Sequence, residues 1–183
     1  MPRGRPQDKK PTFTTLEAPG AGDFGTVGES IHTAGAIAGY YFDANAAYHG
    51  FVRAAGGVIT TFDVPGAGTG YLEGTSAISI NTSGAIAGWY YDAGNVVHGF
   101  VRAASGDVAT FDAPGAGTGA NQGTFASGIN AAGAVSGYYL DASNVFHGFG
   151  RAASGATTAF EAPAQVRTTA RALTAVASTR RGV

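Results

Sequence analysis

The chain has 183 residues, 44% of them hydrophobic, which is enough to bury a core, so wholesale disorder is not expected. The absence of cysteine excludes disulfides, thiolate metal sites and a cysteine nucleophile. The net charge of -1 is unevenly distributed along the chain. Residues 12–163 carry three arginines and eleven acidic residues, which gives them a formal charge of -8. An acidic body is a poor ligand for a phosphate backbone, so no nucleic-acid partner is predicted.

The chain begins with a basic stretch, residues 1–11, which predicts a solvated and disordered tail. This stretch lacks the apolar run of a signal peptide, so nothing in it directs the chain out of the cytoplasm. No apolar run approaches the roughly 20 residues that cross a membrane, so no membrane span is predicted.

Residues 12–163 consist of three similar units with a period of 49 residues. The segments FDVPGAG at 62–68, FDAPGAG at 111–117 and FEAPA at 160–164 mark the period, and LEAPGAG at 16–22 precedes them. The tripeptide His-Gly-Phe recurs with the same spacing at 49–51, 98–100 and 147–149. Such a period is typical of solenoids, propellers and repeat arrays. We therefore divide the domain into units 19–65, 66–114 and 115–163, preceded by an extra strand at 12–18.

Four strands are expected in each unit, and the middle unit shows them in chain order. Residues 75–81 alternate as a strand does, and the turn at 82–84 leads into a second strand at 85–91. A turn at 92–95 precedes a third strand, 96–104, and the fourth, 107–113, stops at a proline. A two-residue loop between the last two strands would pair Phe100 with Phe111, and likewise Phe51 with Phe62 and Phe149 with Phe160.

Four antiparallel strands per unit predict an all-β fold with propeller-like blades, and a β-trefoil is the alternative because three units close it. Three blades alone leave open ends, so we expect either a fragment of a longer array or closure by self-association. The last segment, 164–183, is basic, shares nothing with the units and is predicted to be a disordered tail.

The repeated polar residues have a structural interpretation. Three histidines on a symmetry axis could bind zinc, but they fall on the third strand of each unit and more simply act as hydrogen-bonded structural residues: His49, His98 and His147. Aspartates that open turns satisfy backbone groups without a metal: Asp43, Asp92 and Asp141. The acids before the x-Pro steps, Glu17, Asp63, Asp112 and Glu161, repeat in every unit, whereas an active site usually breaks symmetry. We therefore predict no enzyme, no metal and no cofactor.

Aromatic residues of the second strand are the candidates for a binding surface, because flat amphipathic rings suit contacts with sugars or proteins. They are Tyr40, Trp89, Tyr90 and Tyr138, although half of such rings must point into the core.

The units resemble the bacterial extracellular repeat family named for its His-Ala-Phe tripeptide, the HAF repeat. The resemblance is carried by Ser79-Ile80-Asn81, residues 84–88 and His98-Gly99-Phe100, with glycine in place of the alanine in all three units. It implies a secreted or surface-exposed repeat protein without an established activity. The predicted function is a non-catalytic module that binds carbohydrate or protein, or a structural array; the alternative is a repeat-built carbohydrate-active hydrolase or lyase.

Overall fold

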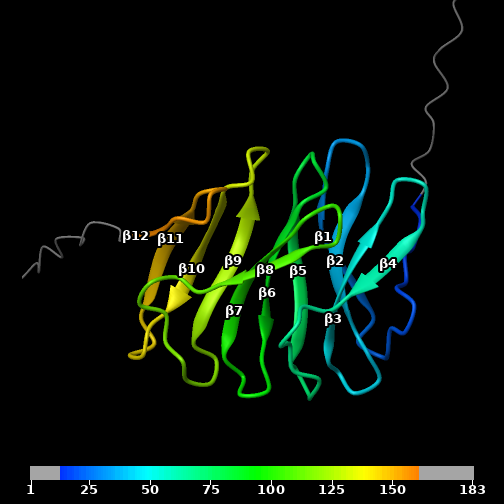
Figure 1. The fold of residues 1–183 in the computed structure, drawn as a ribbon. Coiled ribbons are helices and arrows are strands. Elements are labelled where there is room, and N and C mark those ends of the chain that lie inside the picture. Colours follow the sequence, from blue (N-terminus) through cyan, green and yellow to red (C-terminus); the bar gives the residue numbers. More distant parts are fainter. Residues whose placement is uncertain (1–12, 161–183) are drawn as a thin grey trace, which may run out of the picture.

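A computed structural model describes residues 13–160, which form twelve strands and no helix (Figure 1). The strands form one open mixed sheet in which β1 and β12 stand at the two ends of the strand order. The prediction of an all-β fold is confirmed. The strands are β1 (Thr26–Ile31), β2 (Ile37–Phe42), β3 (Tyr48–Arg53), β4 (Ile59–Phe62), β5 (Gly74–Ile80), β6 (Ile86–Tyr91), β7 (Val97–Arg102), β8 (Val108–Phe111), β9 (Gly123–Ile129), β10 (Val135–Leu140), β11 (Phe146–Arg151) and β12 (Thr157–Phe160).

Consecutive strands pair antiparallel in three groups, β1–β4, β5–β8 and β9–β12, which we call the first, second and third unit. A single parallel pair joins each unit to the next, Tyr48 with Gly74 and Val97 with Gly123. At the first of these pairs the N–H of Tyr48 donates to the carbonyl of Glu73 at 2.7 Å. Gly74 has φ 112° and a Cβ there would meet the Tyr48 carbonyl oxygen, so only glycine allows this approach.

The segment before the first unit differs from the prediction, because residues 13–18 form no strand. The N–H of Ala18 donates to Thr26 Oγ1 at 2.9 Å, and Leu16 packs on the cluster of Ala18, Tyr41 and Phe51. The segment is thus held by this hydrogen bond and by its apolar side chain instead of by a sheet ladder. The tails predicted at 1–11 and 164–183 lie outside the described residues.

The predicted register of the third and fourth strands is wrong by one residue. The N–H of Ala103 donates to the carbonyl of Asp107 at 2.8 Å, so the loop holds three residues, with Gly106 at φ 105°. Such a three-residue loop needs a residue in the left-handed region, and glycine supplies it. Phe100 therefore lies opposite Thr110, and Phe111 lies opposite Gly99. The two rings are on opposite faces of the sheet, and the other units repeat this register.

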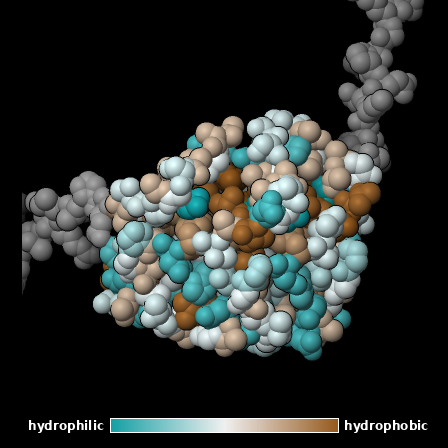
Figure 2. Space-filling model, in the orientation of Figure 1, coloured by the Kyte–Doolittle hydropathy of each residue, from teal (hydrophilic) through white to brown (hydrophobic). Residues whose placement is uncertain are grey.

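The core consequently forms between the units. Phe62 of the first unit contacts Phe100 of the second edge-to-face, with ring centroids 6.2 Å apart, and the guanidinium of Arg102 lies 4.7 Å from the Phe62 ring centre. The pair Phe111 and Phe149 repeats the ring contact at 5.8 Å between the second and third units. Phe51, Phe100 and Phe149 are fully buried. The predicted aromatic pairs within a unit are thus replaced by pairs between units. In the view of Figure 2 apolar side chains reach the surface as separate patches among hydrophilic ones.

Replacement of Gly88 by alanine should destabilise the protein strongly. A Cβ at this position would meet the carbonyl oxygen of Ser76 and lie 2.9 Å from the Phe100 ring, and neither neighbour can move without breaking the sheet or the core. We expect a loss of about 3 kcal/mol in the free energy of unfolding, measured by urea denaturation.

Gly150→Ala is the matched control, because Gly150 also lies within a strand, β11, but a Cβ there meets no atom within 4 Å. The control should unfold at nearly the wild-type urea concentration. Equal destabilisation by both substitutions would disprove the role assigned to the Gly88–Phe100 contact.

Candidate functional site

A row of aromatic side chains crosses all three units on one face of the sheet. Along this row the ring centroids of neighbours lie 4.8–5.9 Å apart. We call it the aromatic ladder; its members, in the order in which they contact one another, are Tyr40 on β2, Tyr48 on β3, Trp89 on β6, Phe125 on β9, Tyr138 on β10 and Phe146 on β11. The contacts from Tyr48 to Trp89 and from Trp89 to Phe125 each pass from one unit to the next.

The ladder is partly open to solvent. Tyr138 and Phe146 are 37% and 68% exposed, and the other four rings are half-buried. Burial raises the pKa of the Tyr40, Tyr48 and Tyr138 hydroxyls above the ordinary value. The rings are therefore held by their neighbours, and each of the six residues keeps part of its surface open to solvent. Such a surface is suited to stacking against flat apolar faces of a ligand.

Tyr90 does not belong to this surface. It follows Trp89 on β6, and successive side chains of a strand point to opposite faces. Tyr90 is 7% exposed, lies in the core cluster between the first and second units and stacks on His98 with centroids 5.1 Å apart. Of the four predicted binding residues, the structure brings together Tyr40, Trp89 and Tyr138 and separates Tyr90 from them.

Each histidine of the His-Gly-Phe tripeptides lies beside aspartates of its own unit. In the second unit His98 Nδ1 is 2.9 Å from Asp112 Oδ1, and His98 Nε2 is 3.5 Å from Asp92 Oδ2. His49 makes the corresponding contacts with Asp63 at 2.9 Å and with Asp43 at 3.6 Å. In the second unit the imidazole thus links the turn before β7 to the end of β8. In the first unit it links the turn before β3 to the end of β4.

The third histidine, His147, has Nε2 3.1 Å from Asp141 Oδ2, and its ring stacks on Tyr139 with centroids 4.8 Å apart. Glu161, the acid that corresponds to Asp63 and Asp112, lies outside the described residues. Within residues 13–160 no group of three or more histidine, aspartate or glutamate side chains is arranged to hold a metal ion.

The aspartates of the turns accept backbone hydrogen bonds. Asp92 Oδ1 accepts from the N–H groups of Gly94 and Val96, both at 2.8 Å. Burial raises the pKa of Asp92, but these bonds and His98 outweigh it, so the pKa is lowered from its ordinary value. The pKa of Asp43 is lowered chiefly by the bond from Ala47, and that of Asp141 by the bond from Val145. These carboxylates stabilise the turns by accepting hydrogen bonds from the backbone, so their role is structural.

Comparisons with protein-family models, with curated proteins and with solved structures found no match. The resemblance to the HAF repeat therefore stays a prediction. Among the described residues there is no helix with the length and hydrophobicity needed to span a bilayer.

The stability of the protein should fall on the acid side. Because the folded-state pKa values of Asp43, Asp92 and Asp141 are lowered, their contribution is complete above the unfolded pKa of about 3.9 and is lost as the pH falls through the folded values. Asp92→Asn keeps a carbonyl oxygen that can accept the turn bonds but cannot titrate. It should lose less stability than the wild type between pH 5 and pH 2, measured as the urea midpoint. Parallel losses in both proteins would contradict this account.

Proposed function

We propose that this chain is a non-catalytic module that binds neutral carbohydrate along the aromatic ladder. The observation that carries the proposal is the unbroken row of partly exposed rings, which crosses every junction between units. An extended ligand would contact several rings at once, so weak stacking contacts at successive rings would add up.

Neutral sugars fit the charge of the surroundings better than anionic polymers do. The domain is acidic, and at one end of the ladder burial, with the charge of Glu29 adding to it, raises the pKa of the Tyr40 hydroxyl. Carboxylates accept hydrogen bonds from sugar hydroxyl groups but repel phosphate and sulfate groups. The pyranose faces, which carry C–H groups, match the aromatic rings. These two features favour neutral carbohydrate over an anionic polymer.

The propeller-like arrangement is part of the same proposal. The first strands of the units contact one another in series, β1 with β5 and β5 with β9, while β2 packs on β5 and β6 on β9. Such packing of successive four-stranded units is typical of propeller blades. A trefoil would bring the third unit against the first, whereas β1 and β12 stand at opposite ends of the strand order (Figure 1). An extracellular location is proposed from the HAF resemblance alone.

The single tryptophan of the chain makes the proposal testable by fluorescence, because Trp89 lies at the centre of the ladder. Titration with a panel of soluble neutral polysaccharides should shift the emission of the wild type for at least one of them. Trp89→Ala should bind that polysaccharide about tenfold more weakly in an affinity gel, since it removes the ring that joins both halves of the row.

Tyr90→Phe is the control, because it changes the adjacent residue on the opposite face and leaves the ladder intact. It should bind as the wild type does. Unchanged binding by Trp89→Ala, or no response to any polysaccharide, would refute the proposal. Release of new reducing ends during the titration would favour the hydrolase or lyase alternative.

A further inference from the structure

The two junctions inside the chain use the same set of contacts. In the first, Phe62 packs on Phe100 beneath the guanidinium of Arg102, and Phe111, Phe149 and Arg151 repeat the arrangement in the second. The N–H of Ile80 donates to Ser30 Oγ, and the N–H of Ile129 to Ser79 Oγ, both at 3.3 Å. In the second junction Asn81 Nδ2 also donates to the Asn130 carbonyl at 2.9 Å. A junction therefore has two complementary sides, which we call the leading side of one unit and the receiving side of the next.

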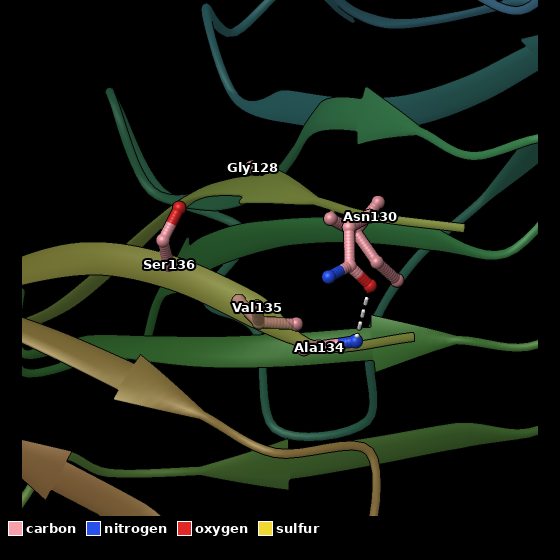
Figure 3. A pocket seen from close by; sticks show the side chains of 6 residues that line it. Gly128, Asn130, Ala134, Val135 and Ser136 are labelled. Atoms are coloured by element: carbon pink, nitrogen blue, oxygen red, sulfur yellow. Dashed lines mark hydrogen bonds between the residues drawn. The ribbon is translucent and has the colours of Figure 1, made fainter. Parts of the chain in front are cut away.

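Within residues 13–160, no further unit covers the leading side of the third unit. Phe160, which corresponds to Phe62 and Phe111, is 59% exposed, and Phe146, the last ring of the ladder, is 68% exposed. A pocket of ≈ 330 Å³ lies on this unit, lined by Gly128, Ile129, Asn130, Ala134, Val135 and Ser136. Figure 3 shows that Asn130 bonds the N–H of Ala134 through Oδ1, at 2.9 Å, and directs its amide nitrogen into the pocket.

The first unit presents the receiving side. Ile31, which corresponds to the buried Ile80, is 66% exposed, and a pocket of ≈ 250 Å³ is lined by Leu16, Gly28, Glu29, Ser30, Ile31 and Ile37. Leu16 packs on the cluster of Phe51, at the place that Phe62 has on Phe100 in the next unit. A leucine of the preceding segment thus stands in for the missing phenylalanine ring.

We propose that a second copy of this chain docks head to tail, with the leading side of the third unit on the receiving side of the first unit of its partner. Phe160 then takes the place of Leu16 over Phe51 and beneath Arg53. Asn130 Nδ2 donates to the main-chain carbonyl of His32, as Asn81 does to Asn130. Phe146 meets Tyr40 of the second copy, as Tyr48 meets Trp89, so the aromatic ladder continues from one chain to the next.

A second copy fits better than any other occupant because both sides of the junction are present in the same chain. Phe160 and Asn130 belong to the leading side, and Phe51, Arg53 and Ile31 belong to the receiving side, while Gly128 replaces the serine of the other units. Among residues 13–160, the segment around Leu16 must leave this position, and in it residues 13–15 are exposed and Leu16 is half-buried. The contact is heterologous, so it produces a closed ring or a filament according to the rotation between copies. It does not depend on the ligand of the ladder.

The test is the molar mass of full-length variants, measured by light scattering coupled to size exclusion. Phe160→Asp places a charge on the leading side, and Ile31→Asp places one on the receiving side; both side chains are exposed in the isolated chain, so folding is preserved and is checked by circular dichroism. The wild type should form a species larger than one chain, and each variant alone should be monomeric. An equimolar mixture of the two should form a dimer, because each variant keeps the side that the other lacks.

A wild type that is monomeric at every attainable concentration would overturn the proposal, as would a mixture of the variants that stays monomeric. A symmetric dimer, in which the same patch serves both chains, would also show no recovery in the mixture and would count against it.

A gain-of-affinity variant provides an independent check. Gly128 stands where the other units have Ser30 and Ser79. The new junction therefore lacks the hydroxyl that would accept a hydrogen bond from the main-chain N–H of Ile31. Gly128→Ser restores it and should tighten self-association about three- to tenfold, since a hydrogen bond has that net worth. In the Ile31→Asp background the same serine should not restore self-association, and a gain there would show that it acts elsewhere.

Discussion

The structure depends on one contact, that of a phenylalanine on the third strand of a unit with a glycine on the second. Phe100 lies directly opposite Gly88, and a Cβ on that glycine would be 2.9 Å from the ring. Because glycine has no side chain, the ring settles against the backbone of β6 and becomes fully buried. The ring of Phe62 from the preceding unit can then approach at 6.2 Å and the guanidinium of Arg102 can cover it. Gly88 thus makes room for the phenylalanine of its own unit, and the ring of the preceding unit packs on that buried phenylalanine.

The sequence predicted the strands well, and it failed where pairing depends on one residue. Period and alternation locate β5 to β8 because both reflect which side chains are buried. The loop after β7 contains Ser105-Gly106, which suggests a two-residue turn, whereas the ladder closes at Ala103 and Asp107. One added loop residue places Phe111 on the face opposite to Phe100. The two rings therefore do not pair inside the unit, and each pairs with a ring of a neighbouring unit instead. Residues 13–18 carry the same pattern as a fourth strand, but in the part of the chain that the structure describes they pair with no strand.

The candidate site was predicted only in part, and the reason is related. A cluster such as Trp89-Tyr90 reveals an aromatic strand but not which face each ring occupies, because both faces of a central unit are covered by neighbours. The ladder members Tyr48, Phe125 and Phe146 were missed because they lie outside the second strand and do not recur in all three units. Val97 stands where the first and third units have Tyr48 and Phe146. Only the packing of one unit on the next shows that residues from different positions form one row.

The two faces of each unit differ in how strictly their residues repeat. On the face that receives the preceding unit, tyrosine, histidine, phenylalanine and arginine recur without change, as at Tyr90, His98, Phe100 and Arg102. On the other face the equivalents vary, from Tyr40 to Trp89 to Tyr138 and from Val27 to Ser76 to Phe125. The same residue types make the same packing contacts at both junctions. The other face also packs at the junctions, through Phe62 and Phe111. Its remaining side chains differ from unit to unit, and among them the aromatic rings form a continuous row.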